Sequence, residues 1–280
     1  MLAYRHHFHA GNFADVFKHA LLARLLRALL RKDQPLCYID THAGAGRYDL
    51  AHRWARKNAE HRDGIERLWR RSDVPDSLAP YVGAVRAENA DGKLRFYPGS
   101  PRIARRLLRP GDRMVLTELN PTDCAELKAL FAVDKRVAVE HLDGEQALKA
   151  YLPPKERRGL VLIDSPFDRA GEFKRTAAAL AAAHQRWATG VYAFWYPLME
   201  PATMRAFDRD VAATEVRKVL QLELSVHPER WTQTLRGCGL LVVNPPFGFD
   251  TEAVPMLDWL ARALAPAGAG GHRVRWLVPE

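Results

Sequence analysis

Four short apolar runs, each followed by a carboxylate, constrain the fold of this chain more than any other feature. The runs end at or near Asp40, Glu118, Asp143 and Asp164, and stretches with helical spacing of apolar residues separate them. Buried strands that alternate with helices are typical of an α/β protein with a parallel sheet. The carboxyl ends of such strands line a ligand crevice, so we expect the four carboxylates to meet at one edge of a doubly wound sheet.

A turn with two glycines follows the first apolar run. Gly44 and Gly46 allow the backbone to approach a ligand closely, as in nucleotide-type cofactor sites. The third glycine of the dinucleotide motif is missing, because position 49 is Asp, and Glu118 lies much further along the chain than the roughly 20 residues expected for the acid that binds the ribose. A tight loop without a ligand is the alternative interpretation of this turn.

The spacing of the core runs predicts an insertion. A βαβ unit spans about 30 residues, but the next core run after Tyr48 begins only at Met114. We therefore expect a single domain over residues 1–280 with an inserted helical subdomain over residues 49–98. After Asp164 the pattern predicts further helices and strands, and the late strands are expected to be antiparallel.

The charge balance favours a polyanionic partner, since 42 Lys and Arg residues oppose 33 Asp and Glu residues and give a net charge of +9. Bases at the start of the insertion fit either a solvated helix face or a phosphate-binding surface. A second cluster is the stronger candidate for a nucleic-acid contact, because no acid lies among its arginines: Arg102, Arg105, Arg106 and Arg109.

Several classes of protein are not favoured. No apolar run approaches the roughly 20 residues of a membrane span, and no signal peptide is visible, so we expect a soluble, cytoplasmic protein without a membrane partner. The three cysteines lie far apart, and only Asp15 accompanies the four histidines near the amino terminus. We therefore expect neither a disulfide framework nor a metal site.

Two tetrapeptides compete for the reacting position. Residues 164–167 (Asp-Ser-Pro-Phe) and 244–247 (Asn-Pro-Pro-Phe) both resemble the signature of methyltransferases that act on adenine N6 or cytosine N4 amino groups. The second matches better as a string. The first closes the fourth strand counted from the cofactor strand, where the methyltransferase fold places this signature. We therefore place the reaction at Asp164 and treat Asn244 as the alternative.

The residues at 164–167 suit methylation of an amino nitrogen. Such a nitrogen is a poor nucleophile because its lone pair is delocalised into the ring. Hydrogen bonds from its protons to Asp164 and to the carbonyl of Ser165 or Pro166 would localise the lone pair. Asp164 would then accept the released proton as general base, and Phe167 would stack against an extruded base. The methyl group would come from a sulfonium, and this transfer needs no metal.

The whole chain resembles the bacterial 23S ribosomal RNA adenine-N6 methyltransferase family, the large-subunit methyltransferases J. The resemblance rests on the following segments: residues 4–6, 9–12, 18–19, 40–48, 97–101, 117–119, 143–144 and 195–197. It implies a class I Rossmann-like methyltransferase fold, S-adenosylmethionine as donor and an adenine of 23S rRNA as acceptor. The implied RNA is a protein-poor precursor rather than the assembled subunit, and the implied enzyme is a monomer.

The same resemblance implies roles for individual residues. Glu118 would bind the ribose of the cofactor, and Asp143 with Gly144 would bind its adenine. The other cofactor contacts would come from His19, His42, Gly44, Gly46, Ser100 and Asp164. Substrate contacts would come from Tyr4, His6 and Lys18.

One departure from the family pattern lies at the reacting segment. The family has Asp-Pro-Pro-Tyr where this chain has Asp-Ser-Pro-Phe. Phe167 keeps the stacking face and loses only a hydroxyl. Ser165 frees a backbone dihedral that proline would fix, so the adjacent carbonyl is held less rigidly. We expect this change to affect the turnover rate more than the class of reaction.

Three other functions fit parts of the sequence. An NAD-dependent dehydrogenase would need the missing glycine and an acid nearer than Glu118. A DNA adenine-N6 methyltransferase would need a target-recognition segment, for which the basic insertion is a candidate. A non-catalytic nucleic-acid-binding protein is the third alternative, although the acids at the strand ends would repel its ligand.

Overall fold

The computed structural model describes residues 5–265 and 268–280, and it contains an eight-stranded sheet in the order β10-β8-β9-β7-β6-β1-β4-β5. The five strands from β7 to β5 run parallel, whereas β9 and β10 are antiparallel to their neighbours. The prediction of an α/β sheet with antiparallel late strands is therefore confirmed. The strands are β1 Cys37–Asp40, β4 Arg113–Thr117, β5 Val137–Glu140, β6 Gly159–Ile163, β7 Val191–Pro197, β8 Val219–Ser225, β9 Gly237–Val243 and β10 Gly271–Val278.

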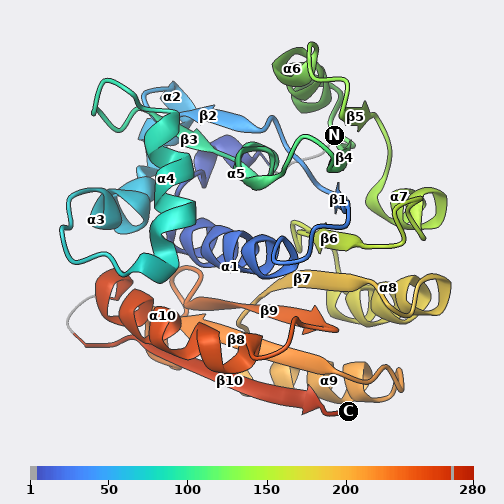
Figure 1. The fold of residues 1–280 in the computed structure, drawn as a ribbon. Helices are drawn as coiled ribbons and strands as arrows, with labels where there is room; N and C mark the ends of the chain where they lie inside the picture. The colour runs from blue at the N-terminus through green and yellow to red at the C-terminus, as the bar shows by residue number, and fades with distance from the viewer. Residues whose placement is uncertain (1–4, 266–267) are drawn as a thin grey trace.

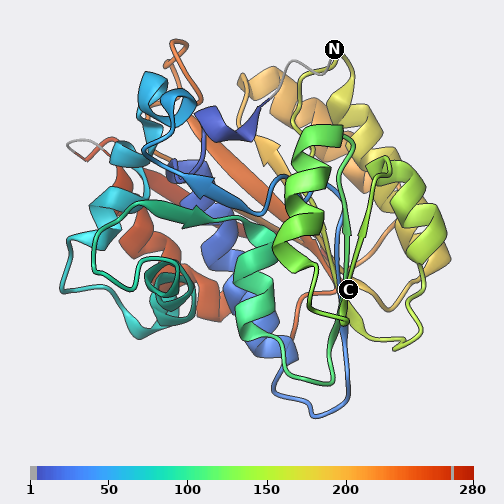
Figure 2. The ribbon, with the colours of Figure 1, turned by 90° about the horizontal axis from the view of Figure 1, so that it is seen from above.

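Helices cover both faces of the sheet, as Figures 1 and 2 show. Two separate apolar clusters fill the two interfaces between helices and sheet. Alternating side chains of each strand point to opposite faces, so strands such as β1, β4, β6 and β7 contribute to both clusters. One face carries α1 Phe13–Leu29, α4 Ala79–Ala87, α5 Ser100–Leu107, α6 Pro121–Phe131 and α10 Phe249–Leu264. The other carries α7 Gly144–Tyr151, α8 Glu172–Arg186 and α9 Pro201–Ala212.

Helix α1 is the main packing element of the first face. The side chain of Asn12 caps it by accepting a hydrogen bond of 2.9 Å from the amide of Asp15. Residues 14–23 are all buried, because α4, α5 and α10 surround the helix. Three polar side chains, Asp15, Lys18 and His19, are nevertheless among these buried residues.

The segment between Asp49 and Phe96 is helical, as expected for the insertion. It contains α2 Arg53–Asn58, η2 Glu60–Asp63, α3 Ile65–Trp69, η3 Asp76–Leu78 and α4. Two short strands at the start and end of this segment, β2 Arg47–Asp49 and β3 Phe96–Pro98, pair in an antiparallel way. The sequence did not reveal this pair, because strands of three residues are too short to show alternation. The boundaries of the subdomain, 49–98, stay a prediction.

Candidate active site

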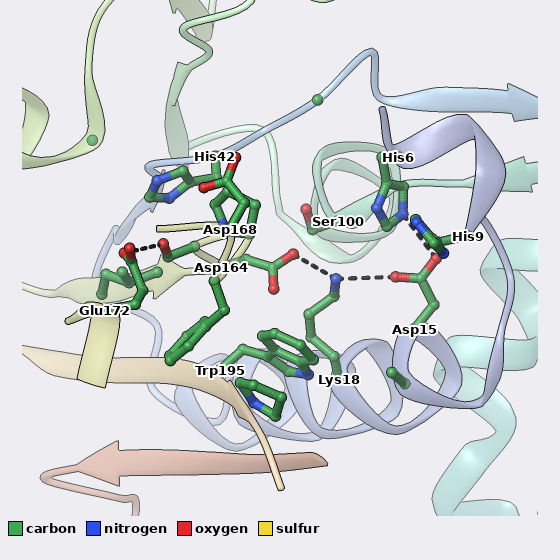
Figure 3. A pocket seen from close by; sticks show the side chains of 18 of the residues that line it. His6, His9, Asp15, Lys18, His42, Ser100, Asp164, Asp168, Glu172 and Trp195 are labelled. Carbon is green, nitrogen blue, oxygen red and sulfur yellow. Dashed lines mark hydrogen bonds and ion pairs between the residues drawn. The ribbon is translucent and has the colours of Figure 1, made fainter. Parts of the chain in front are cut away.

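A cavity of about 1060 Å³ opens at the carboxyl ends of the parallel strands. Most of the side chains proposed from the sequence line it, as Figure 3 illustrates. Tyr4 lies outside the described residues. The proposed residues that line the cavity are His6, Lys18, His19, His42, Gly44, Ser100, Glu118, Asp143, Gly144, Asp164, Ser165, Pro166 and Phe167.

The glycine turn forms one wall of the cavity. Gly44 has a φ of 59°, and its amide donates a hydrogen bond of 2.8 Å to Oε2 of Glu118. The other oxygen of Glu118 accepts a bond of 2.7 Å from the amide of Asn120. Glu118 therefore ties the turn after β1 to the end of β4.

Gly46 does not line the cavity. Its carbonyl accepts a hydrogen bond of 2.9 Å from the amide of Gly99. A Cβ atom at Gly46 would lie 2.8 Å from Leu127, and its φ is 76°. The turn therefore needs glycine at this position for packing and backbone conformation.

Asp40 also lies beneath the cavity rather than in its wall, so three of the four strand-end carboxylates line the crevice instead of four. Its Oδ2 accepts hydrogen bonds of 2.7 Å from the hydroxyls of Tyr38 and Ser100. Burial raises the pKa of Asp40. Ser100 is the first residue of α5, and Gly99 is the N-cap of this helix.

The end of β5 places a second pair of proposed cofactor residues. Asp143 caps α7 by accepting a bond of 2.9 Å from the amide of Glu145. A Cβ atom at Gly144 would lie 2.7 Å from Cε1 of His42. The ring of His42 is held 2.8 Å from the hydroxyl of Thr41 through Nδ1. Gly144 thus leaves just enough room for His42 at the wall of the cavity.

Lys18 bridges two carboxylates at the floor of the cavity, as the dashed lines in Figure 3 show. Its Nζ lies 2.5 Å from Oδ2 of Asp164 and 3.0 Å from Oδ1 of Asp15. Oδ2 of Asp15 contacts Nε2 of His6 at 2.9 Å and accepts a bond of 2.9 Å from the amide of Gly11. A continuous polar chain therefore runs from His6 to Asp164.

Asp15 is the member of this chain that the sequence analysis missed. It is 2% exposed. Burial by itself would raise the pKa of Asp15, but its electrostatic interactions with His6 and Lys18 hold this pKa well below the usual value. The only signal in the sequence was that Asp15 is the sole acid among the first four histidines, and a first-turn helix residue explained it equally well.

The reacting segment is restrained by side chains that follow it. The hydroxyl of Ser165 donates a hydrogen bond of 2.6 Å to Glu172 at the start of α8. Phe167 has a φ of 51°, and its ring contacts Phe173 and Trp195 edge-on, with centroids 4.9 and 5.9 Å away. The bond to Glu172 supplies part of the restraint that a proline at position 165 would have given.

Asn244 lies near the amino ends of the parallel strands, at the opposite end of the sheet from the cavity. Strand β9 is antiparallel to β7, so it ends near the amino end of the parallel strands. The side chain of Asn244 donates hydrogen bonds of 2.8 Å to the carbonyls of Ala188 and Gly190. Asn244 does not line the cavity, and Phe247 is fully exposed. Asp164 is thus the member of the two tetrapeptides that shares a cavity with the glycine turn.

Three arginines of the cluster at 102–109 are paired with acids that lie outside this segment of the sequence. Arg102 pairs with Glu88 at 2.5 Å, and Arg105 pairs with Asp134 at 2.5 Å. Arg109 contacts Asp112 at 3.1 Å. The expectation that no acid balances this cluster is wrong for three of its four arginines.

Two histidines at the cavity have opposite electrostatic environments. His19 is fully buried, which holds its pKa well below the usual value, and its Nδ1 lies 2.7 Å from the hydroxyl of Tyr97. The pKa of His9 is raised because it hydrogen-bonds Glu60, with both carboxylate oxygens 3.0 Å from Nδ1. His19 is therefore neutral near pH 7.

We expect His9 to titrate above its reference pKa of 6.5 in the folded protein. The contact with Glu60 then stabilises the fold fully below pH 6.5 and is lost as the pH rises through the folded-state pKa. NMR titration of the His9 ring measures this value. In a Glu60→Gln variant the pKa should fall, and a wild-type His9 that titrates at or below its reference value would contradict the expectation.

Two further searches cover the described part of the chain. None of its groups of His, Cys, Asp and Glu has the arrangement of a metal site with three or more ligands. None of its helices is long and apolar enough to cross a membrane.

Comparison with known proteins yields a family and a fold. The family model described as RsmJ, "Ribosomal RNA large subunit methyltransferase D, RlmJ", matches residues 33–278. Two curated relatives are both described as ribosomal RNA large subunit methyltransferase J. The protein of Escherichia coli (strain K12) is 45% identical over 280 residues, and that of Haemophilus influenzae is 43% identical over 281 residues. Each alignment covers 100% of both chains.

Two solved structures have folds similar to that of this chain. The crystal structure of protein LPL1258 from Legionella pneumophila has a TM-score of 0.88 at 38% identity, and the alignment covers 96% of this chain and 98% of that chain. A probable spermidine synthase from Corynebacterium glutamicum has a TM-score of 0.51 at 14% identity, over 91% of this chain and 73% of that chain. At that identity the second similarity concerns the fold alone.

Proposed function

The chain belongs to the ribosomal RNA large subunit methyltransferase J family, and from this premise we propose that it methylates the N6 amino group of an adenine in 23S rRNA. Its fold is that of the class I S-adenosylmethionine-dependent methyltransferases. The observation that carries the proposal is the position of Asp164, which lines one cavity together with the Gly44 turn and Glu118.

The cavity suits a cationic donor. Carboxylates of Glu118, Asp143 and Asp164 line it, and such a field favours a sulfonium over an anionic cofactor. S-adenosylmethionine would supply an electrophilic methyl group on that sulfonium. Glu118 accepts hydrogen bonds from two backbone amides. It keeps lone pairs for further hydrogen bonds, since a carboxylate offers about four acceptor sites. We therefore propose that it binds the ribose hydroxyls.

Lys18 orients the reacting carboxylate. Its ammonium contacts Oδ2 of Asp164, and Oδ1 would be the acceptor for an adenine amino proton. A backbone carbonyl of Ser165 or Pro166 would accept the other amino proton. After the methyl group has moved to N6, the released proton would pass to Asp164. Phe167, which is partly exposed in the cavity, would stack against the extruded base.

Methylation assays with three acceptors test the proposal. We expect methyl-labelled S-adenosylmethionine to label protein-free 23S rRNA more than the assembled subunit, and duplex DNA not at all. Mass spectrometry of digested rRNA should then find N6-methyladenosine. Labelling of duplex DNA in place of rRNA would favour the DNA methyltransferase alternative, and a methyl group on another atom would contradict the role of Asp164. We further propose that the active form is a monomer.

A further inference from the structure

The cavity and its surroundings carry opposite charges. Among the residues that line it, the acids far outnumber Lys18, Arg169 and Arg175; they are Asp15, Glu60, Asp63, Glu118, Asp123, Asp143, Glu145, Asp164, Asp168 and Glu172. A cavity of this kind repels phosphate groups while it attracts a cation. An RNA that presents one base here therefore needs cations outside the cavity to hold its phosphates.

Helix α2 carries such cations beside the opening. Arg53, Arg56 and Lys57 are exposed on it, and its last residue, Asn58, lines the cavity. None of the three cations forms an ion pair with a residue in the described part of the chain. An exposed trio of bases without carboxylate partners is a suitable surface for a polyanion.

The acids closest in sequence to α2 are already bound elsewhere. Asp49 pairs with Arg95 at 3.1 Å. Glu60 accepts hydrogen bonds from Asn12 and contacts His9, each at 3.0 Å. Neither acid compensates the charge of α2, whereas acids do compensate four other arginines of the insertion. Those pairs are Arg67–Asp63, Arg70–Glu66, Arg71–Asp73 and Arg95–Asp49. Arg62 and Arg86 are the other arginines of the insertion for which no ion pair occurs among the described residues.

Aromatic contacts fix α2 relative to the cavity. The ring of Trp54 stacks on Phe8 with centroids 5.7 Å apart and meets His7 edge-on at 5.6 Å. The guanidinium of Arg5 lies 5.7 Å from the centroid of the same ring. Phe8 and His7 belong to η1 His6–Phe8, which also carries His6 into the cavity wall. A phosphate bound on α2 would therefore lie in a fixed position relative to His6 and the polar chain behind it.

We infer that the exposed face of α2, formed by Arg53, Arg56 and Lys57, binds the phosphodiester backbone of the RNA strand next to the target adenine. The inference rests on the proposed function and adds where the RNA is held. It also separates α2 from the arginines at 102–109, three of which stabilise the fold through ion pairs.

A triple variant, Arg53→Ala with Arg56→Ala and Lys57→Ala, tests the inference through RNA binding. Fluorescence anisotropy with a protein-free fragment of 23S rRNA should show Kd raised on the order of tenfold at physiological salt. The slope of log K against log salt concentration should become shallower by about 0.7 for each phosphate of a single strand that is no longer neutralised, so by about 2 in total. Affinity for S-adenosylmethionine and the thermal unfolding midpoint should remain those of the wild type.

The matched control removes the same charge elsewhere. Arg70, Arg217 and Arg262 are exposed and lie outside the cavity wall, so their replacement by Ala should leave the salt slope unchanged. An unchanged Kd in the α2 variant, or an equal weakening in both variants, would overturn the inference. Binding alone decides this, so a wild-type protein that binds the fragment without methylating it would contradict the proposed function and not the role of α2.

Discussion

Replacing Asp164 by Asn should lower kcat for methyl transfer to rRNA by about 10³-fold, within the range of 10² to 10⁴ typical of general acid–base catalysis. The amide keeps the size of the side chain and an acceptor oxygen, but it cannot take the proton released from N6. It also removes the charged interaction of 2.5 Å with Lys18. Single-turnover kinetics with labelled donor measure the chemical step, and calorimetry should show that S-adenosylmethionine still binds.

The matched control for this variant is Asn244→Ala, which changes the competing tetrapeptide. Asn244 bonds to Ala188 and Gly190 at the far edge of the sheet, so its replacement should leave kcat unchanged. Full activity in the Asp164→Asn variant, together with loss of activity in Asn244→Ala, would move the reaction to the other tetrapeptide. That outcome would also remove the main support for the proposed mechanism.

The second large effect concerns stability rather than turnover. Asp15→Ala should lower the free energy of unfolding by about 3 kcal/mol, because it removes one partner of a buried ion pair and leaves Lys18 with Asp164 as its single carboxylate partner among the described residues. Lys18 is 4% exposed, and His6 and the amide of Gly11 also depend on Asp15. Urea unfolding at pH 7 measures the decrease.

The dependence of stability on pH tests the contribution of Asp15 in a second way. The folded-state pKa of Asp15 lies well below 3.8, so the stabilisation is present above pH 3.8 and is lost as the pH falls through the folded-state value. The Asp15→Ala variant should therefore lose less stability on acidification than the wild type. Asp33, whose side chain is fully exposed, is the control, and Asp33→Ala should change stability by no more than about 0.5 kcal/mol. An equally small effect of Asp15→Ala would show that the buried network contributes little.

The sequence was sufficient to predict the parallel core and its ligand edge. Four of the five parallel strands are runs of apolar residues with an acid at or shortly after their carboxyl end, and three of these acids, Glu118, Asp143 and Asp164, line one cavity. The place that the methyltransferase fold gives to the signature, after the fourth strand from the cofactor strand, favoured Asp164 over Asn244, and in the structure the antiparallel strand before Asn244 ends at the opposite end of the parallel strands. These conclusions depend on periodicity and topology, which a sequence carries locally.

Contacts between distant segments could not be predicted in this way. The acids that balance Arg102 and Arg105 lie at positions 88 and 134, so a cluster that looks unpaired in the sequence is paired in space. Asp15 looks like an ordinary first-turn acid until Lys18 and His6 are seen beside it. The restraint of Ser165 by Glu172 likewise requires the start of α8 to fold back.

Lys18, whose ammonium contacts Asp164, belongs to helix α1, which is buried along most of its length. This position has an evolutionary consequence. Catalytic and binding side chains often belong to loops, whose sequences can change without destabilising the helices and strands that they connect. Lys18 instead shares its helix with Phe17, Leu21 and Leu25, which are completely buried. A substitution that changes the packing around these three residues will therefore also move Lys18. Changes that adapt the stability of the protein to temperature and changes that adapt its catalytic rate then involve the same side chains of α1.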